Sequence, residues 1–210
     1  MADGHAIDQL KQALRRLPGV GPRTAQRMAF HLLERDREGG QILADALRDA
    51  VSSVKHCQRC NNFSEQGLCS ICESGKRDET LLCVVETPAD LDTIEQAGAY
   101  TGYYFVLMGH LSPLDGIGPD QLGVERLLQV VSERSVQEVI LGTNLTVEGE
   151  ATADYLCDLF EGKPLTVSRL ARGVPSGGEL EYMDANTLSQ AFSDRRTLHQ
   201  HTLAPESANE

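Results

Sequence analysis

Four cysteines with the spacing of a metal site carry the most specific chemical signal in the sequence. Two Cys-x-x-Cys pairs, separated by eight residues, offer four thiolates to one ion: Cys57, Cys60, Cys69 and Cys72. Four thiolates satisfy tetrahedral Zn²⁺ and leave no open coordination position, so we predict one structural zinc ion per chain. An iron–sulfur cluster could use the same ligands. Two disulfides are a third interpretation, which a reducing compartment disfavours.

The cysteines outside these pairs give no sign of chemistry. Cys83 and Cys157 fall within apolar stretches, and both are predicted to be buried thiols. His56 precedes the first zinc ligand. Because four thiolates already fill the coordination shell, this histidine is predicted to lie on the surface.

A glycine-containing turn between two helical patterns predicts a contact with phosphate groups. The turn reads Leu-Pro-Gly-Val-Gly-Pro-Arg over residues 17–23. Gly19 and Gly21 would leave backbone N–H groups open to an anion at the start of the following helix. Arg23 and Arg27 lie four residues apart on one face of that helix, and Lys11 is a weaker candidate. We expect DNA binding that ignores base sequence and weakens with salt, the alternative being a purely structural corner or dimer contact.

Acidic side chains near predicted strand ends form the third candidate site. Glu86 ends an apolar run, and Glu148 and Glu150 follow a later one. The carboxyl ends of parallel strands meet at one end of a sheet, so these carboxylates could gather and hold Mg²⁺. Alternatively, Glu148 and Glu150 simply open a helix, whose dipole favours acids there. The sequence contains no Gly-x-x-x-x-Gly-Lys-Ser/Thr nucleotide motif, and no catalytic triad can be picked from spacing.

The elements that must position these residues follow a simple order. Helices are predicted over 7–16, from Pro22 to a stop at Gly39 and Gly40, and over 41–54, followed by the cysteine segment. Strands at 81–85, 103–108, 139–141 and 165–167 then alternate with helices at 88–97, 120–133 and 149–161, before a last helix at 186–198. This alternation predicts an α/β domain with a small parallel sheet covered on both faces, so the chain as a whole is α+β.

The charge is distributed unevenly along the 210 residues. The net charge is −12, but residues 1–60 carry 10 basic and 7 acidic side chains, so the remainder carries −15. The net charge argues against a single basic surface that coats nucleic acid. The basic amino-terminal part joined to an acidic body is a clue to function, the alternative being ordinary solvated helix faces. No run of 18 apolar residues and no signal-peptide pattern is present, so we expect a cytoplasmic, nucleoid-associated protein without a membrane span.

The acidic part resembles the Toprim domain of topoisomerases and primases. The resemblance rests on the strand-end Glu86 and the later Glu148-Gly149-Glu150 segment. In metal-using relatives two aspartates precede that segment, whereas this chain has Asn144 and Thr146. Two of the expected metal carboxylates are therefore missing, which argues against phosphoryl transfer. A magnesium-dependent Toprim nuclease or topoisomerase-like enzyme is kept as the alternative function.

The whole chain resembles the RecR family of bacterial recombination mediators over about residues 7–198. The blocks that carry the resemblance are LPGVGPRTAQRMAFHLL (17–33), the cysteine pairs, CVVETP (83–88), LMGHLSPLDGIGP (107–119), TVEGEATA (146–153) and RGVPSGGELEY (172–182). Leu145 departs from the proline expected there.

The resemblance implies a non-catalytic mediator that acts with RecO and RecF to promote RecA loading on single-stranded gaps. It also implies homodimers that pair into tetrameric rings around DNA. Glu148, Glu150 and His110 are the residues expected to contact RecO, the alternative for His110 being a plain loop histidine. The expected domains are a helix-hairpin-helix domain (1–54), a four-cysteine zinc finger (55–78), a Toprim domain (79–175), a C-terminal segment in oligomer contacts (176–198) and a tail (199–210).

Overall fold

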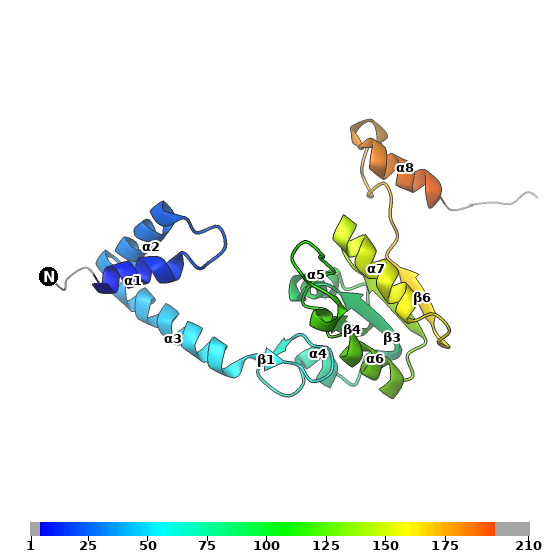
Figure 1. Ribbon diagram of the computed structural model, residues 1–210, viewed down its shortest axis with the longest axis horizontal. Helices are drawn as coiled ribbons and strands as arrows, with labels where there is room; N and C mark the ends of the chain where they lie inside the picture. The colour runs from blue at the N-terminus through cyan, green and yellow to red at the C-terminus, as the bar shows by residue number, and fades with distance from the viewer. Residues whose placement is uncertain (1–4, 196–210) are drawn as a thin grey trace, which may run out of the picture. The chain divides into compact units, whose positions relative to one another are not determined.

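The computed structural model describes residues 5–195 (Figure 1). The chain divides into two compact units. The first unit contains the residues up to Gln58 together with Asn62–Glu73. The second contains Arg59–Asn61 and the residues from Ser74 onward.

The first unit begins with three helices, α1 (His5–Leu14), α2 (Pro22–Glu34) and α3 (Arg37–Ser53). Ala25 and Ala29 of α2 are completely buried, because their small side chains allow the helices to approach closely. Pro22 occupies the first turn of α2, where its missing N–H costs nothing. The two helices predicted around the glycine turn are therefore present.

The prediction that Gly39 and Gly40 end the second helix is wrong. Helix α2 ends at Glu34, and both glycines lie in the first turn of α3. The reason is the side chain of Asp36, which accepts a hydrogen bond from the Gly39 N–H at 2.8 Å and caps the helix. A side chain on Gly39 would collide with that carboxylate, so the glycine allows the cap.

The cysteine segment is built from very short elements. Strands β1 (Lys55–His56) and β2 (Phe63–Ser64) form an antiparallel pair, and α4 (Ser70–Glu73) is a single turn of helix. Backbone hydrogen bonds close the loop between the strands, from Cys57 N–H to the Asn62 oxygen (2.7 Å) and from Gln58 N–H to the Gly67 oxygen (2.8 Å). Such a segment has little apolar core of its own.

The second unit contains the predicted parallel sheet. Its strands are β3 (Asp78–Val85), β4 (Gly102–Val106), β5 (Glu138–Gly142) and β6 (Thr166–Arg169), in the order β4-β3-β5-β6. Helices α5 (Pro88–Ala97), α6 (Val124–Glu133) and α7 (Val147–Leu159) connect them. Every residue of β4 is buried, so the sheet is covered on both faces there. The predicted helix over 120–133 is interrupted at Gly123 (φ +63°), with a 3₁₀ turn, η1 (Pro119–Leu122), before α6.

The core of this unit is apolar. Its largest completely buried side chains include Phe105, Leu127 and Leu156. Cys83 is buried as predicted, and burial raises the pKa of its thiol to about 12. The prediction for Cys157 is wrong, because this residue lies on the exposed side of α7.

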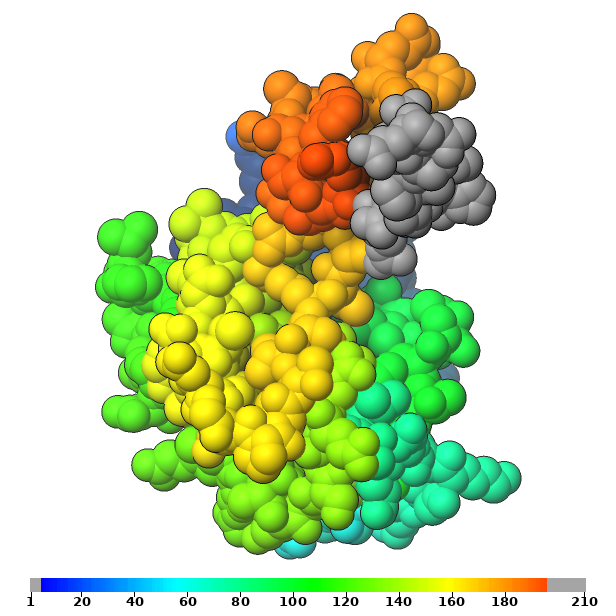
Figure 2. Space-filling view, turned by 90° about the vertical axis from the view of Figure 1, so that its right-hand side faces the viewer, coloured from blue at the N-terminus to red at the C-terminus, as the bar shows by residue number. Residues whose placement is uncertain are grey.

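The C-terminal part contains a 3₁₀ turn, η2 (Leu180–Tyr182), and helix α8 (Ala185–Ser193). Figure 2 shows this part as a lobe joined to the rest of the unit by the segment that follows β6. Helix α8 begins where predicted, with Asp184 as its N-cap, and ends earlier. Residues 196–198 of the predicted helix and the tail 199–210 lie outside the described residues. Within residues 5–195, no helix is long and apolar enough to cross a membrane.

Candidate functional sites

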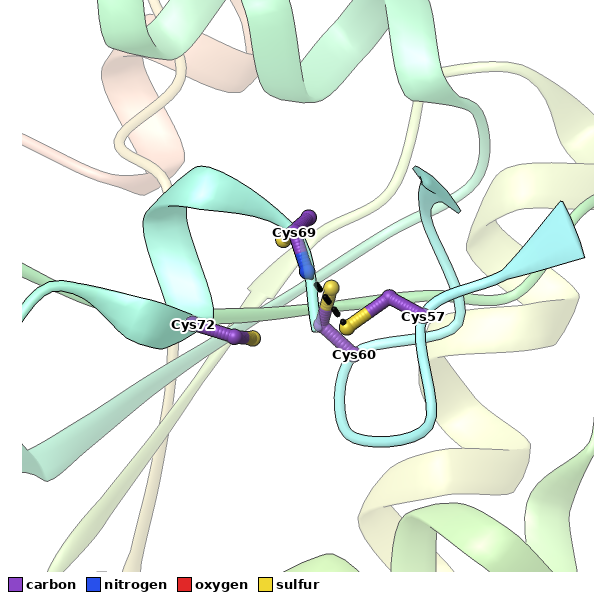
Figure 3. A group of neighbouring side chains, drawn as sticks. All are labelled: Cys57, Cys60, Cys69 and Cys72. Carbon is purple, nitrogen blue, oxygen red and sulfur yellow. Dashed lines mark hydrogen bonds between the residues drawn. The ribbon is translucent and has the colours of Figure 1, made fainter. Parts of the chain in front are cut away.

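The four predicted zinc ligands converge in the structure (Figure 3). All four side chains are buried, and their sulfur atoms lie within 4.8 Å of one another. Sulfurs bound to one Zn²⁺ at about 2.3 Å lie roughly 3.8 Å apart, so small rotations of the side chains are enough to close the site. The donor set is four thiolates with no open position, which suits a structural zinc ion and offers nothing to a substrate.

A backbone donor supports the cluster. The N–H of Cys69 donates to the sulfur of Cys57 at 3.3 Å, a hydrogen bond that helps to orient this sulfur in the cluster (Figure 3). His56 is exposed in β1, as predicted, and its ring lies against Phe63 with the ring centroids 5.5 Å apart.

The glycine turn combines one position whose backbone conformation favours glycine and one position that is open to solvent. Gly19 has φ +76°, a left-handed conformation that favours glycine. Gly21 precedes α2 with φ −82°, which any residue can adopt, and a side chain there would meet no atom within 4 Å. The fold of the described chain therefore does not require a glycine at position 21. A glycine at this position leaves the backbone open to the approach of an external group such as the phosphate predicted from the sequence.

Two predicted DNA-contacting residues lie on one face beside this turn. Arg23 and Arg27 are both exposed, and they line an open hollow of about 590 Å³. Lys11 is engaged differently, because its ammonium group pairs with Asp8 (3.1 Å) and lies over the ring of Phe30.

The hollow contains a third arginine that the sequence reading missed. Arg35 lines it together with Arg23 and Arg27. It lies eight residues after Arg27, a spacing of about two helical turns. Extending the arginine series along α2 would have found it.

The strand-end acid of the second unit is deeply buried. Glu86 is only 2% exposed, and its carboxylate accepts hydrogen bonds from the backbone N–H (2.7 Å) and the side-chain amide (2.8 Å) of Asn144. The ring of His110 lies 3.2 Å from the same carboxylate. Glu86 follows β3 and Asn144 follows β5, the two central strands, where ligand sites of parallel sheets occur.

The structure does not bring the three candidate magnesium ligands together. Among residues 5–195, the four cysteines are the one group whose ligand atoms could share an ion. Glu148 and Glu150 both lie in the first turn of α7, as the alternative interpretation had it. At Glu86 itself, the backbone N–H and side-chain amide of Asn144 occupy both oxygens of the carboxylate that a cation would need.

Glu150 is engaged with two arginines that the sequence reading did not connect with it. Its carboxylate accepts hydrogen bonds from Arg169 (2.8 Å) and Arg172 (2.7 Å). Burial alone would raise the pKa of Glu150, but these hydrogen bonds outweigh it and hold the pKa below its ordinary value. Separations of 19 and 22 residues leave no periodic signal from which such a contact could be read. Glu148, by contrast, is half-buried, and no ion pair to it is found within the described chain.

Comparison with protein families accounts for nearly the whole chain. Residues 7–51 match the RecR helix-hairpin-helix, residues 54–74 the four-cysteine zinc finger domain of RecR, residues 80–171 the Toprim domain and residues 173–196 the RecR C-terminal region. This order of domains defines a zinc-containing Toprim protein of DNA repair and recombination, with a DNA-binding amino-terminal part. The chain belongs to the RecR family. The four cysteines accordingly form a structural zinc site.

Proposed function

We propose that the protein is a non-catalytic recombination mediator that binds DNA without sequence preference and acts with RecO and RecF to promote RecA loading on single-stranded gaps. The single observation that supports the DNA-binding part of this proposal is the hairpin between α1 and α2. It places Gly19, Gly21 and two exposed arginines at the start of α2. A helix start supplies free N–H groups and the positive end of a dipole, and the arginines add charge-assisted contacts to phosphates.

The proposal that the protein is not an enzyme is supported by the surroundings of Glu86. Both oxygens of this carboxylate receive donors from Asn144, so the position of a metal-binding aspartate is taken by an amide. Thr146, at the second such position, instead caps α7 by accepting from the Gly149 N–H (3.1 Å). Neither group offers the negative charge that a divalent cation prefers.

The surface proposed for RecO lies at the start of α7. Glu148 is its principal acid, and we include His110, whose ring contacts Glu86. Glu150 contributes less, because its carboxylate is held by two arginines. An acidic surface on a body with a large negative charge suits a basic partner and steers its approach.

Self-association into dimers and tetramers is supported by apolar side chains that the single chain leaves in solvent. On α3 these are Ile42, Leu43, Leu47 and Val51, and on the C-terminal lobe they are Leu180, Tyr182 and Phe192. Exposed apolar faces of this kind are typical of subunit interfaces. Linked copies would raise the local concentration of hairpins and strengthen an otherwise weak hold on DNA.

Two further parts of the proposal concern organisation and place. We divide the chain into domains at 1–54, 55–78, 79–175 and 176–198, with a tail at 199–210, and we place the protein in the cytoplasm, associated with the nucleoid. Proteolysis at neutral pH tests the division, since the first cuts should fall near residues 54, 78 and 175.

The experiment that tests the function measures RecA loading on gapped DNA coated with single-strand-binding protein. Glu148→Ala should abolish RecO-dependent loading while leaving DNA binding intact. Glu161→Ala is the matched control, because Glu161 is an exposed acid just beyond the other end of α7. If purified protein nicks supercoiled plasmid with Mg²⁺, and Glu86→Gln removes that activity, the non-catalytic proposal is wrong.

A further inference from the structure

The contact between Glu86 and Asn144 joins two segments that are 58 residues apart. A buried carboxylate is costly unless donors satisfy both of its oxygens. Here one residue supplies both donors, its backbone N–H to one oxygen and its side-chain amide to the other. These two hydrogen bonds fix both the backbone and the side chain of Asn144. A single hydrogen bond would fix only one of them.

The contact also determines how the segment that follows Asn144 packs against Glu86. The carbonyl oxygen of Asn144 lies against Gly149, where any side chain would collide with it and would come within 2.7 Å of Glu86. Thr146 then caps α7 by accepting from the Gly149 N–H. Residues 144–149 are therefore packed onto Glu86 from both ends of the segment.

A second chain of hydrogen bonds reaches the same segment from the loop after β4. The completely buried hydroxyl of Thr152 donates to the Glu148 carbonyl oxygen (2.7 Å) and accepts from the Leu111 N–H (2.9 Å). His110, the neighbour of Leu111, contacts Glu86. The backbone of Glu148 is thus held between two contacts that both lead back to the end of β3.

We propose that Glu86 and Asn144 form an internal latch that positions the start of α7 and with it the surface offered to a basic partner. Glu86 is a positioning residue in this proposal, and Asn144 occupies the place of an external ligand. The inference rests on the proposed function for the choice of partner, but the latch itself also has a readout that does not depend on RecO.

The test exchanges the chemistry of the two side chains. Asn144→Asp places a second carboxylate, on an exposed residue, at hydrogen-bond distance from the buried carboxylate of Glu86, and two carboxylates that close repel each other. Adding Glu86→Gln to this variant restores a carboxylate–amide pair of the same size and charge, with the two roles reversed. Glu86→Gln alone should be mild, because the Asn144 amide can rotate to offer its oxygen to the new amide.

Two measurements, amide hydrogen exchange and RecO binding, report whether the latch is intact. We expect Asn144→Asp to speed amide hydrogen exchange over residues 144–150 and to weaken RecO binding by about tenfold or more in calorimetry, since the surface is no longer preorganised. The double variant should return both to within about threefold of the wild type. DNA affinity should not change in either. Asn186→Asp, which adds the same charge at the exposed start of α8, is the control.

The outcomes separate the latch from the choice of partner. Unchanged exchange and RecO affinity in Asn144→Asp, or failure of the double variant to rescue them, would overturn the latch. If Asn144→Asp does not fold and the double variant does, the pairing is supported directly. If exchange rises and is rescued while Glu148→Ala leaves RecO binding intact, the latch stands and the RecO surface is wrong.

Discussion

The most direct quantitative prediction concerns the salt dependence of DNA binding. Arg23 and Arg27 are exposed and carry no ion pair within the described residues. Log affinity falls with log salt, and each neutralised phosphate contributes about 0.9 to the steepness of that fall. If each arginine neutralises one phosphate, replacing both by alanine should make the slope shallower by about 1.8. At about 0.1 M salt the same change weakens binding by roughly 60-fold for each hairpin that contacts DNA.

Fluorescence anisotropy of labelled DNA, titrated between about 50 and 200 mM salt, measures both quantities. The control is Arg48→Ala, which removes the same type of side chain from α3, where it pairs with Asp45 at 2.6 Å. We expect the control to keep the wild-type slope, because a change in net charge far from the phosphates is screened. DNA of different base sequence should give the same result, since no base is contacted.

One result would refute the reasoning directly. An unchanged slope in the double variant, with the oligomeric state intact, would show that phosphates are not contacted by these arginines. A loss of affinity with an unchanged slope would point to altered packing of α2, and the hairpin would then be structural.

Three further predictions concern the rest of the chain. Removing zinc with a chelator should release one ion per chain and speed hydrogen exchange over residues 55–73, because the metal supplies on the order of 10 kcal/mol to a segment with little core. Among the six cysteines, Cys157 should react first with a maleimide, while Cys83 should stay unmodified at about pH 8, since burial raises its pKa to about 12; fast labelling that survives Cys157→Ser would contradict this. The pKa of Glu95 is held below its ordinary value chiefly by the hydrogen bond from Arg77, so its contribution to stability is present above about pH 4.5 and is lost as the pH falls through the lowered pKa. Arg77→Met should flatten that acid-side loss of stability in urea titrations at about pH 3–6, and an unchanged profile would show that the pair contributes nothing.

The parts of the molecule that the sequence predicts well are those governed by local spacing. The Cys-x-x-Cys pairs identify the zinc ligands because a tetrahedral ion needs nearby thiolates, and the alternation of apolar runs with amphipathic stretches predicts the parallel sheet. The position of the glycine turn before α2 and the exposure of Arg23 and Arg27 follow from local spacing in the same way, while their contact with DNA stays a prediction.

The parts that the sequence does not predict depend on contacts between distant segments or on a single side chain. Adjacent glycines usually end a helix, but the cap provided by Asp36 outweighs this tendency at Gly39. The hydrophobic pattern places Cys157 within an apolar stretch, but it does not determine whether the residue lies on the buried or the exposed face of α7. The partner of Glu86 follows the neighbouring strand β5, 58 residues further along the chain, so no spacing rule connects Glu86 with Asn144.

The hydrogen bonds that join Cys60 and Asn61 to the end of β4 have a consequence for the handling of the protein. Strand β4 is the outermost strand of the sheet, next to β3. At its end, Val106 donates to the Cys60 carbonyl oxygen (2.8 Å), and the Asn61 amide donates to the Val106 oxygen (2.7 Å). Cys60 and Asn61 thus cover the Val106 end of this sheet edge, where free backbone groups would otherwise allow another chain to pair. Metal depletion is therefore expected to promote aggregation through that edge, visible as light scattering that grows with protein concentration.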